Sequence, residues 1–292
     1  MKYFKRFLII LFIVFISLVA KYYDDYSFST NDFSNVDGNL IVNFIDVGQG
    51  DSIFLEFPNG KNMLIDVGEK SKSELVQNFI DLKGYISLDY VVGTHPHTDH
   101  IGGLENIIEN YKIGEIYLPK VIHTSKTYEN LLSKINELGY KVNTAKSDMI
   151  IFDENGLVVK ILSPIYSEYS ELNNYSVVIK VVFGNTSFLF MGDAEAVVEN
   201  EILREVNADV VKVGHHGSGT SSSDEFVNSV NAEYAVIMSG VDNQYDLPDE
   251  NVVNRWKSSG AVVYNTSVNG NIVMISDGND ISVEVEHESD NW

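Results

Sequence analysis

Five of the seven histidines lie in two short segments, and each segment stands at the end of an apolar run that is typical of a β-strand. The first segment, residues 94–100, reads THPHTDH, and the second, residues 211–218, reads VKVGHHGS. Histidine and carboxylate side chains are the ligands that divalent zinc, manganese or iron ions prefer. We therefore expect a fold that brings the ends of several strands together around a shared metal site.

The spacing within the first segment suits two ions. His95 and His97 are two residues apart in an extended chain, so both side chains can face the same ion. The turn after Pro96 then lets Asp99 and His100 face a second ion. The alternative interpretation is a surface loop that happens to be rich in histidine.

A carboxylate and a histidine pair complete the candidate ligands. Asp193 follows Met191-Gly192 at the end of another apolar strand, where its two oxygens can bridge two ions. A residue in this position can also belong to a simple turn. His215 and His216 lie at a third strand end, although such a pair is often a surface feature. Ligand-type side chains at three separate strand ends favour a metal site over three coincidences.

The rest of the sequence alternates short apolar strands with helices. Strands are expected at 40–47, 52–57, 62–67, 88–93, 158–162, 176–183, 186–191, 209–213, 234–239, 261–264, 270–276 and 280–286, and helices at 73–82, 104–108, 127–138, 194–206, 223–230 and 250–259. Hairpin-linked strands mixed with single helices predict the α/β (α+β) class, with two mixed β-sheets and helices outside them. Because no Pro-rich linker or repeat divides residues 40–287, we expect one domain there.

The N-terminus is typical of an export or anchor signal. Lys2, Lys5 and Arg6 precede an apolar run at 7–20, which is short for a membrane span and suits a signal peptide. No clean cleavage site follows this run. An uncleaved signal-anchor over residues 1–22 is therefore an alternative to a cleaved signal peptide, and a buried helix of the domain is the third interpretation. Residues 23–39 are polar and are interpreted as a tether. Either export reading predicts an extracellular location, secreted or anchored to the outer face of the cytoplasmic membrane.

Composition excludes several kinds of chemistry. The chain has no cysteine, which rules out disulfides, thiol catalysis and Cys-ligated zinc. Its 42 Asp and Glu against 20 Lys and Arg give a formal net charge of −22. Such a field repels phosphates and argues against a broad nucleic-acid clamp. Catalysis on a phosphate stays open, because bound metal ions can reverse the sign of the charge locally.

The histidine segments and the sequences around them resemble a known superfamily. Residues 95–100 match the metal signature HxHxDH of the metallo-β-lactamase-fold hydrolases. Four further stretches follow the order seen in the hydrolase domain of ComEC-type DNA-uptake proteins: FIDVGQGD at 44–51, MLIDVG at 63–68, FMGDAE at 190–195 and VKVGHHGS at 211–218. The resemblance covers residues 41–276 and implies a four-layer αββα sandwich. The chain lacks the many membrane helices of a ComEC channel, so it is not expected to be the uptake pore.

The resemblance also implies a role for each candidate ligand. The expected ligands form two sets that share one carboxylate: His95 and His97 for the first metal, Asp99, His100 and His215 for the second, and Asp193 bridging both. His215 is preferred over His216 because the superfamily ligand commonly follows a strand-end glycine, as Gly214 does here. His216 stays open as the ligand or as a proton carrier.

Asp99 and Asp66 also have expected roles in proton transfer and in ligand orientation. Asp99 would steer the attacking water or accept its proton, so Asp99 and His216 are the candidate catalytic residues. By resemblance, Asp66 would accept a proton from a ligand histidine and fix its tautomer. Its alternative role is a turn cap.

The sequence departs from the superfamily pattern in two places. Many members have another histidine that completes the first metal site, whereas the corresponding region here reads LNNYS at 172–176, as in the ComEC-type subgroup. The ComEC-type pattern also has a His-Pro-His stretch near the C-terminal third, where this chain has Leu247-Pro248-Asp249. The second departure weakens the assignment as a nuclease more than it weakens the assignment as a hydrolase.

Together these features predict an exported metal-dependent hydrolase, a phosphoesterase or phosphodiesterase that uses one or two divalent ions, Zn²⁺ or Mn²⁺. Such ions lower the pKa of a bound water toward neutrality and so supply the hydroxide nucleophile. The expected substrate is an extracellular phosphoester such as nucleic acid, teichoic acid or a phosphocholine-bearing polymer, and an uncleaved N-terminus would make the cytoplasmic membrane a partner. The rival function is a non-catalytic cell-surface binding module that retains the fold.

Overall fold

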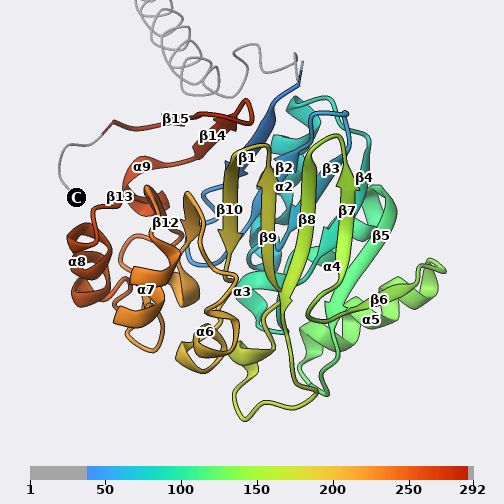
Figure 1. Ribbon diagram of the computed structural model, residues 1–292. Helices are drawn as coiled ribbons and strands as arrows, with labels where there is room; N and C mark the ends of the chain where they lie inside the picture. The colour runs from blue at the N-terminus through green and yellow to red at the C-terminus, as the bar shows by residue number, and fades with distance from the viewer. Residues whose placement is uncertain (1–37, 289–292) are drawn as a thin grey trace, which may run out of the picture.

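The computed structural model describes residues 38–288 as a layered α+β structure (Figure 1). The expected signal or anchor segment at 1–22 and nearly all of the expected tether at 23–39 lie outside the described residues. Among the residues that the structure describes, no helix has both the length and the apolar character needed to cross a bilayer.

Two mixed β-sheets form the centre of the molecule. The first sheet has the order β15-β14-β1-β2-β3-β4-β5-β6 and the second β13-β12-β11-β10-β9-β8-β7. The strands of the first sheet are β1 Leu40–Phe44, β2 Ile53–Glu56, β3 Asn62–Ile65, β4 Ser87–Val92, β5 Lys112–Pro119, β6 Val142–Ala145, β14 Ile272–Ser276 and β15 Ile281–Val285. Those of the second are β7 Ile150–Glu154, β8 Leu157–Ser163, β9 Val178–Phe183, β10 Thr186–Phe190, β11 Val210–Lys212, β12 Tyr234–Ile237 and β13 Val262–Asn265.

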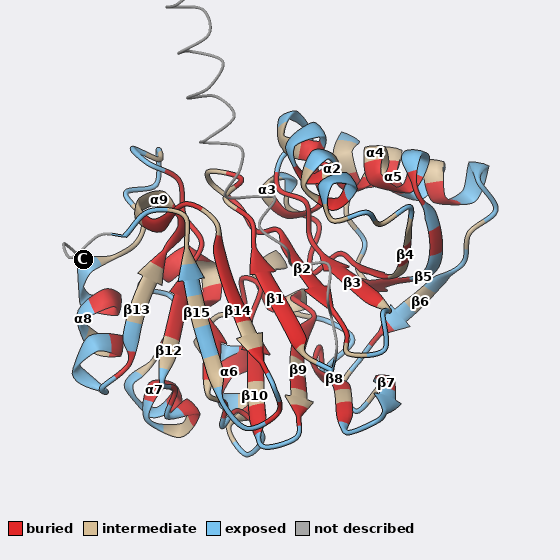
Figure 2. Ribbon diagram, turned by 90° about the horizontal axis from the view of Figure 1, so that it is seen from above, coloured by how far each residue is buried: buried red, intermediate tan, exposed pale blue. Residues whose placement is uncertain are grey.

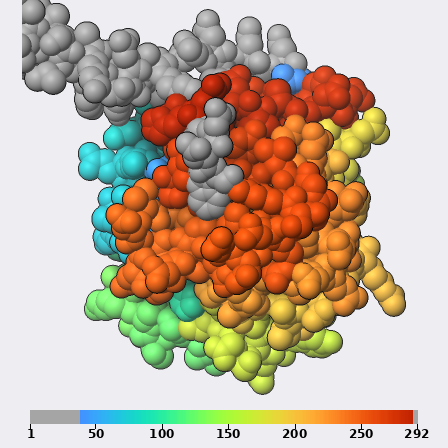
Figure 3. All heavy atoms as spheres, turned by 90° about the vertical axis from the view of Figure 1, so that its left-hand side faces the viewer, coloured from blue at the N-terminus to red at the C-terminus, as the bar shows by residue number. Residues whose placement is uncertain are grey.

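Helices cover the outer face of each sheet. The helices are α2 Ser73–Leu82, α3 Thr98–Ile101, α4 Leu104–Asn110, α5 Lys126–Glu137, α6 Ala196–Ile202, α7 Asp224–Val230, α8 Glu250–Ser258 and α9 Thr266–Asn269, with 3₁₀ turns η1 Lys70–Lys72, η2 Leu172–Tyr175 and η3 Gly214–Gly217. Figure 2 shows α2, α4 and α5 on one side of the sheets and α6, α7 and α8 on the other. The outer face that carries α7 and α8 is built mostly from the C-terminal part of the chain (Figure 3).

Three apolar cores hold these layers together. The central core lies between the two sheets and includes Phe44, Phe57, Phe188 and Phe190, all essentially inaccessible to solvent. A second core joins α6, α7 and α8 to one sheet, and a third joins α2, α4 and α5 to the other. Strands buried on both faces explain the nearly continuous apolar runs of the sequence, such as LIVNF in β1. The expected four layers and two mixed sheets are confirmed.

The strands that the sequence analysis does not predict are β5, β6 and β7. β6 and β7 stand at the edges of their sheets and keep several residues exposed, so their sequences lack a strong apolar pattern. In β5 the apolar run is interrupted by Gly114 and Glu115. Gly114 lets the neighbouring strand approach, because a Cβ at this position would lie 2.5 Å from the carbonyl oxygen of Asp89.

Candidate metal centre

The candidate ligands follow strands that are parallel neighbours. Asp66 follows β3, and the segment 94–100 follows β4, which pairs with β3 in parallel in the first sheet. Asp193 follows β10, and η3 follows β11, its parallel neighbour in the second sheet. Parallel neighbours end at the same edge of a sheet, and the two sheets pack face to face through the central core. All these side chains therefore meet at one end of the sandwich.

The first group of side chains consists of His95, His97 and Asp193, whose ligand-type atoms lie within 4.8 Å of one another. Nε2 of His95 is 3.0 Å from Nδ1 of His97 and 3.5 Å from Oδ2 of Asp193. His95 and Asp193 are buried, whereas His97 is half-buried at the cleft side. The pair predicted to face one ion is thus brought together with the predicted bridging carboxylate.

The second group consists of Asp99, His100, Asp193 and His216. Nε2 of His100 is 3.2 Å from Nε2 of His216 and also 3.2 Å from Oδ2 of Asp193. Nε2 of His216 is 3.3 Å from Oδ2 of Asp99 and 3.4 Å from Oδ1 of Asp193. Asp193 belongs to both groups, which is the position expected for a carboxylate that bridges two ions.

The geometry of both groups fits divalent cations. Two imidazole nitrogens on a tetrahedral zinc ion lie about 3.3 Å apart, given Zn–N bonds of about 2.0–2.1 Å. The separations of 3.0 and 3.2 Å between the paired histidines are close to this value. Oδ1 of Asp193 is buried and has no hydrogen-bond donor, which is unusual for a buried carboxylate. One or two divalent ions at this centre would satisfy that oxygen, and ligands of this kind suit Zn²⁺ and Mn²⁺.

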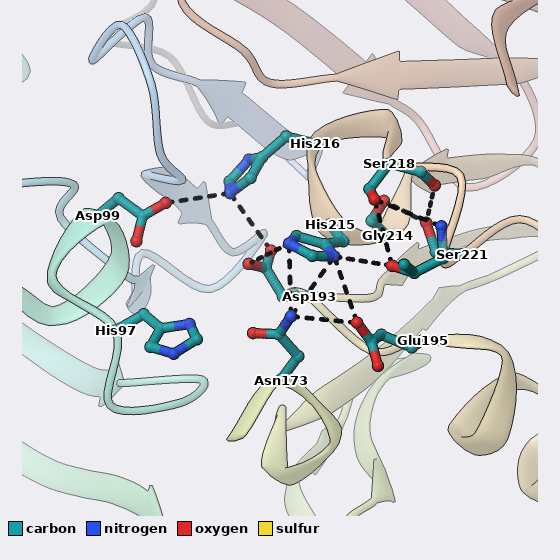
Figure 4. Close-up of polar contacts among 12 residues, drawn as sticks. His97, Asp99, Asn173, Asp193, Glu195, Gly214, His215, His216, Ser218 and Ser221 are labelled. Carbon is teal, nitrogen blue, oxygen red and sulfur yellow. Dashed lines mark hydrogen bonds and ion pairs between the residues drawn. The ribbon is translucent and has the colours of Figure 1, made fainter. Parts of the chain in front are cut away.

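The structure places His216, and not His215, in the second group. His216 is buried, and its Nδ1 donates to the carbonyl of Met238 at 2.8 Å, which leaves Nε2 free to bind an ion. Nε2 of His215 stays 3.9 Å from the nearest Asp193 oxygen, and its Nδ1 lies 3.0 Å from Oγ1 of Thr220 (Figure 4). The geometry therefore reverses the preference for His215 that the sequence supports.

The backbone explains why the residue directly after Gly214 is not the one that reaches the second group. β11 ends at Lys212, and the chain then enters η3, where His215 and His216 both have left-handed backbone angles, φ 48° and 52°. Two successive residues of this kind turn the second imidazole inward and leave the first beside the cleft. Counting one residue past a strand-end glycine cannot detect such a turn.

Asp66 holds one ligand histidine in place. It is fully buried, and its Oδ2 accepts from Nδ1 of His100 at 2.8 Å. The backbone N–H and the hydroxyl of Thr94 also donate to it, at 2.8 and 2.6 Å. With Nδ1 donating to Asp66, Nε2 of His100 is the ring nitrogen that faces the second group. This arrangement agrees with the role that the resemblance implies for Asp66.

The histidines of the two groups experience different electrostatics. Burial lowers the pKa of His95 and of His97 and keeps both imidazoles neutral, as ligands must be. Burial acts in the same direction on His100 and His216, but the nearby carboxylates, Asp193 foremost, outweigh it and hold both pKa values well above the usual range. A cation that binds the second group must therefore displace protons.

A buried lysine lies directly behind the centre. Lys212, at the end of β11, is fully buried and forms an ion pair with Asp51. Its Nζ also donates to the carbonyl of Gly192 at 2.9 Å and lies 4.0 Å from Oδ1 of Asp193. The sequence analysis misses this residue, although a lysine inside the apolar run VVKV is the signal that could reveal it.

The candidate centre opens into a cleft of about 690 Å³. The side chains that line the cleft come from six parts of the chain: Gln49; Glu69; His97, Thr98 and Asp99; Asp193; His215, His216 and Ser218; and Asn243, Gln244, Tyr245 and Leu247. Among these lining residues there is no lysine or arginine. An anion that enters this cleft therefore depends on bound cations for its neutralisation.

The structure also shows where the two departures from the superfamily pattern lie. Leu247 lines the cleft, while Asp249 caps α8, since its side chain accepts from the backbone N–H of Asn251 at 2.8 Å. Asn243 holds the intervening loop through hydrogen bonds from its Nδ2 to the carbonyls of Gly240 and Leu247, at 2.9 and 2.6 Å. The region 172–176, which lacks the additional histidine, forms η2.

Comparisons with known proteins agree with this geometry. The Metallo-beta-lactamase superfamily profile matches residues 45–241, more than half of the chain. ComE operon protein 3 of Bacillus subtilis (strain 168) is 30% identical over 251 residues, which cover 79% of this chain and 32% of that protein. Recombination protein 2 of Haemophilus influenzae is 32% identical over 237 residues, covering 79% of this chain and 28% of that protein. The chain thus spans less than a third of the length of either relative.

A solved structure shows the same fold. The metallo-beta-lactamase fold protein YhfI from Bacillus subtilis superposes with a TM-score of 0.52 over 85% of this chain and 100% of that chain, at 14% identity. The two helix-covered sheets therefore belong to a fold that a solved protein also has. The chain belongs to the metallo-beta-lactamase superfamily and is a relative of the ComEC-type competence proteins.

Proposed function

We propose that the chain is a metal-dependent hydrolase that cleaves a phosphoester, most readily a phosphodiester. The observation that carries the proposal is the pair of ligand groups that share Asp193 and open into one cleft. Members of this superfamily are generally metal-dependent hydrolases. When bound, two divalent ions would polarise the phosphoryl oxygens and activate water for in-line attack.

The residues of the chain would divide the remaining work. His95, His97, His100 and His216 hold and orient the ions together with Asp193. Asp99 is the more exposed of the two ligand carboxylates, with 25% of its side chain accessible, and it lines the cleft. It would therefore steer the attacking water and accept its proton. His216 is better suited to hold an ion than to carry a proton, because it is buried and the hydrogen bond from its Nδ1 to Met238 directs Nε2 at the second group.

The proposed substrate is an extracellular phosphoester, and nucleic acid, teichoic acid and phosphocholine-bearing polymers belong to this class. The name of one relative, Recombination protein 2, refers to recombination and supports nucleic acid within this class. The absence of lysine and arginine from the described cleft lining favours a substrate that offers one phosphodiester at a time. Location outside the cytoplasmic membrane is part of the same proposal and rests on the N-terminal sequence.

A non-catalytic cell-surface binding module is the alternative function. It is favoured by Leu247 and Asp249, which stand where ComEC-type proteins usually have histidines. Asp249 serves α8 as a cap and is therefore engaged in the fold. A protein of this kind would bind metal without turnover.

Hydrolysis of bis-p-nitrophenyl phosphate separates the two functions. The full-length chain, purified in mild detergent, should release p-nitrophenolate when Zn²⁺ or Mn²⁺ is present. His97→Ala and Asp193→Ala should each abolish this turnover, because each removes a side chain from the ligand groups. Stoichiometric metal without turnover on this ester or on a panel of other phosphoesters would support the binding module instead.

A further inference from the structure

The first group of ligands has one protein side chain fewer than the second. Asp99, His100, Asp193 and His216 supply four ligand-type side chains, whereas His95, His97 and Asp193 supply three. In many superfamily members a further histidine belongs to the first metal position. Here the corresponding segment is η2, so the side chains of η2 are the ones to consider for the open place.

η2 is fixed directly against the first group. Ser176 follows η2, and its hydroxyl accepts from the backbone N–H of Asp193 at 3.0 Å and lies 3.4 Å from Nδ1 of His95. The next residue, Val177, donates its backbone N–H to the carbonyl of Thr94 at 3.0 Å. The end of the segment is thus joined to Asp193, to His95 and to Thr94, which are the residues of the first group and the residue directly before it.

Asn173 in η2 carries an oxygen without a hydrogen-bond partner. Its Nδ2 donates to Oε1 of Glu195 at 3.3 Å and lies 3.4 Å from each ring nitrogen of His215. A carboxylate only accepts hydrogen bonds, so the amide nitrogen must face Glu195 and the oxygen must face the other way. Oδ1 is buried and has no donor in reach. Figure 4 shows it turned to the side on which His97 lies.

We propose that Oδ1 of Asn173 is the additional protein ligand of the first metal position, in the place where many superfamily members have a histidine. The inference rests on the proposed metal centre and specifies its ligand set. A cation would satisfy an oxygen that is otherwise buried without a hydrogen-bond partner, which is unfavourable. An amide oxygen is a neutral, hard ligand, so it makes the first position better suited to Mn²⁺ than a third imidazole would.

Metal titration of single variants tests the assignment without reference to turnover. The full-length metal-free chain is titrated with Mn²⁺ and with Zn²⁺ by calorimetry, and bound metal is counted by elemental analysis. Asn173→Ala should weaken the first position about tenfold or more, comparable to the loss of a partner of a metal ligand. Asn173→Asp keeps an oxygen at the same place and should retain both ions. Asn173→His should bind two ions and shift the preference toward Zn²⁺.

Asn174→Ala is the matched control. Asn174 lies in the same turn and also donates to Glu195, at 3.3 Å, but its oxygen is occupied by the backbone N–H of Glu195. This variant should therefore bind two ions with affinities within about twofold of the unmodified chain. Equal losses in Asn173→Ala and Asn174→Ala, or a loss in Asn173→Asp as large as in Asn173→Ala, would overturn the assignment.

The outcome is independent of the proposed reaction. A chain that binds two ions through Asn173 and hydrolyses no phosphoester would contradict the hydrolase function and leave the ligand assignment intact. A chain that hydrolyses phosphodiesters while Asn173→Ala binds both ions with unchanged affinity would support the hydrolase function and contradict the ligand assignment.

Discussion

At the scale of single residues, His215 and His216 show how neighbouring identical side chains acquire different roles. His216 lies among Asp99, His100 and Asp193, whereas about a quarter of the His215 side chain is exposed beside the cleft. The sequence predicts both as site residues and favours His215 as the ligand, whereas the structure places His216 in the second group. That choice depends on the left-handed turn at 215–216, which leaves no clear trace in the sequence.

Alanine substitutions at the pair should have unequal effects. His216→Ala should lose one of two bound ions, because it removes a nitrogen from the second group, and its phosphodiesterase rate should fall at least about a hundredfold. His215→Ala should keep both ions. Elemental analysis of the dialysed variants provides the count, and a loss of metal confined to His215→Ala would restore the assignment that the sequence favours.

The buried pair of Lys212 and Asp51 is a second residue-scale feature. Removing one partner of a buried ion pair leaves the other charge uncompensated, which typically costs about 3–5 kcal/mol. The side chain of Asp51 is itself buried and faces other buried side chains, including His216 at 3.4 Å from its Oδ1, so solvent cannot compensate for the lysine.

Lys212→Met should therefore lower the free energy of unfolding by about 3–5 kcal/mol in urea denaturation. The double variant Lys212→Met with Asp51→Asn should recover part of this loss, because the orphaned charge is removed as well. Equal stability of Lys212→Met and the unmodified chain would show that the pair contributes nothing net to the fold.

At the scale of elements, strand order brings the site together. Most strands and helices could be predicted from their apolar periodicity, and α5, expected at 127–138, occurs at Lys126–Glu137. Edge strands β6 and β7 could not, because exposure weakens their pattern. The local apolar pattern also could not predict which strands pair with each other. The parallel pairs β3–β4 and β10–β11, which align the site segments, follow from packing across the whole chain.

Asp249, which stands where the ComEC-type resemblance implies a histidine, has a structural role at the same scale. As the first-turn cap of α8, Asp249 satisfies a backbone N–H that would otherwise lack a partner in the helix. Asp249→Ala should lower the free energy of unfolding by about 0.5–2 kcal/mol. Its metal content should not change, since Asp249 belongs to neither ligand group. Thermal denaturation and elemental analysis of the same sample check both parts, and a loss of metal would assign Asp249 to the centre.

At the scale of the whole molecule, metal binding and folding are coupled. The centre draws its ligands from both sheets, so an ion bound there joins the two halves of the sandwich. Binding to the folded chain alone stabilises it, by about 2.7 kcal/mol at a free ion concentration a hundredfold above Kd. For a domain of this size that corresponds to a rise in Tm of about 5–10 °C.

Chelation with EDTA should therefore lower the Tm of the metal-loaded chain by about 5–10 °C, and added Zn²⁺ or Mn²⁺ should restore it. Differential scanning calorimetry measures the shift, with Asp193→Ala as the control that should not respond to metal. An identical Tm of the unmodified chain with and without EDTA would contradict the coupling between metal binding and folding.

The central claim is that two ligand groups share one carboxylate, and counting bound metal in three variants tests it most directly. Elemental analysis should find two ions in the unmodified chain, one in His97→Ala, one in His216→Ala and none in Asp193→Ala, because Asp193 alone belongs to both groups. An Asp193→Ala variant that keeps two ions, with its circular dichroism unchanged, would contradict the shared centre.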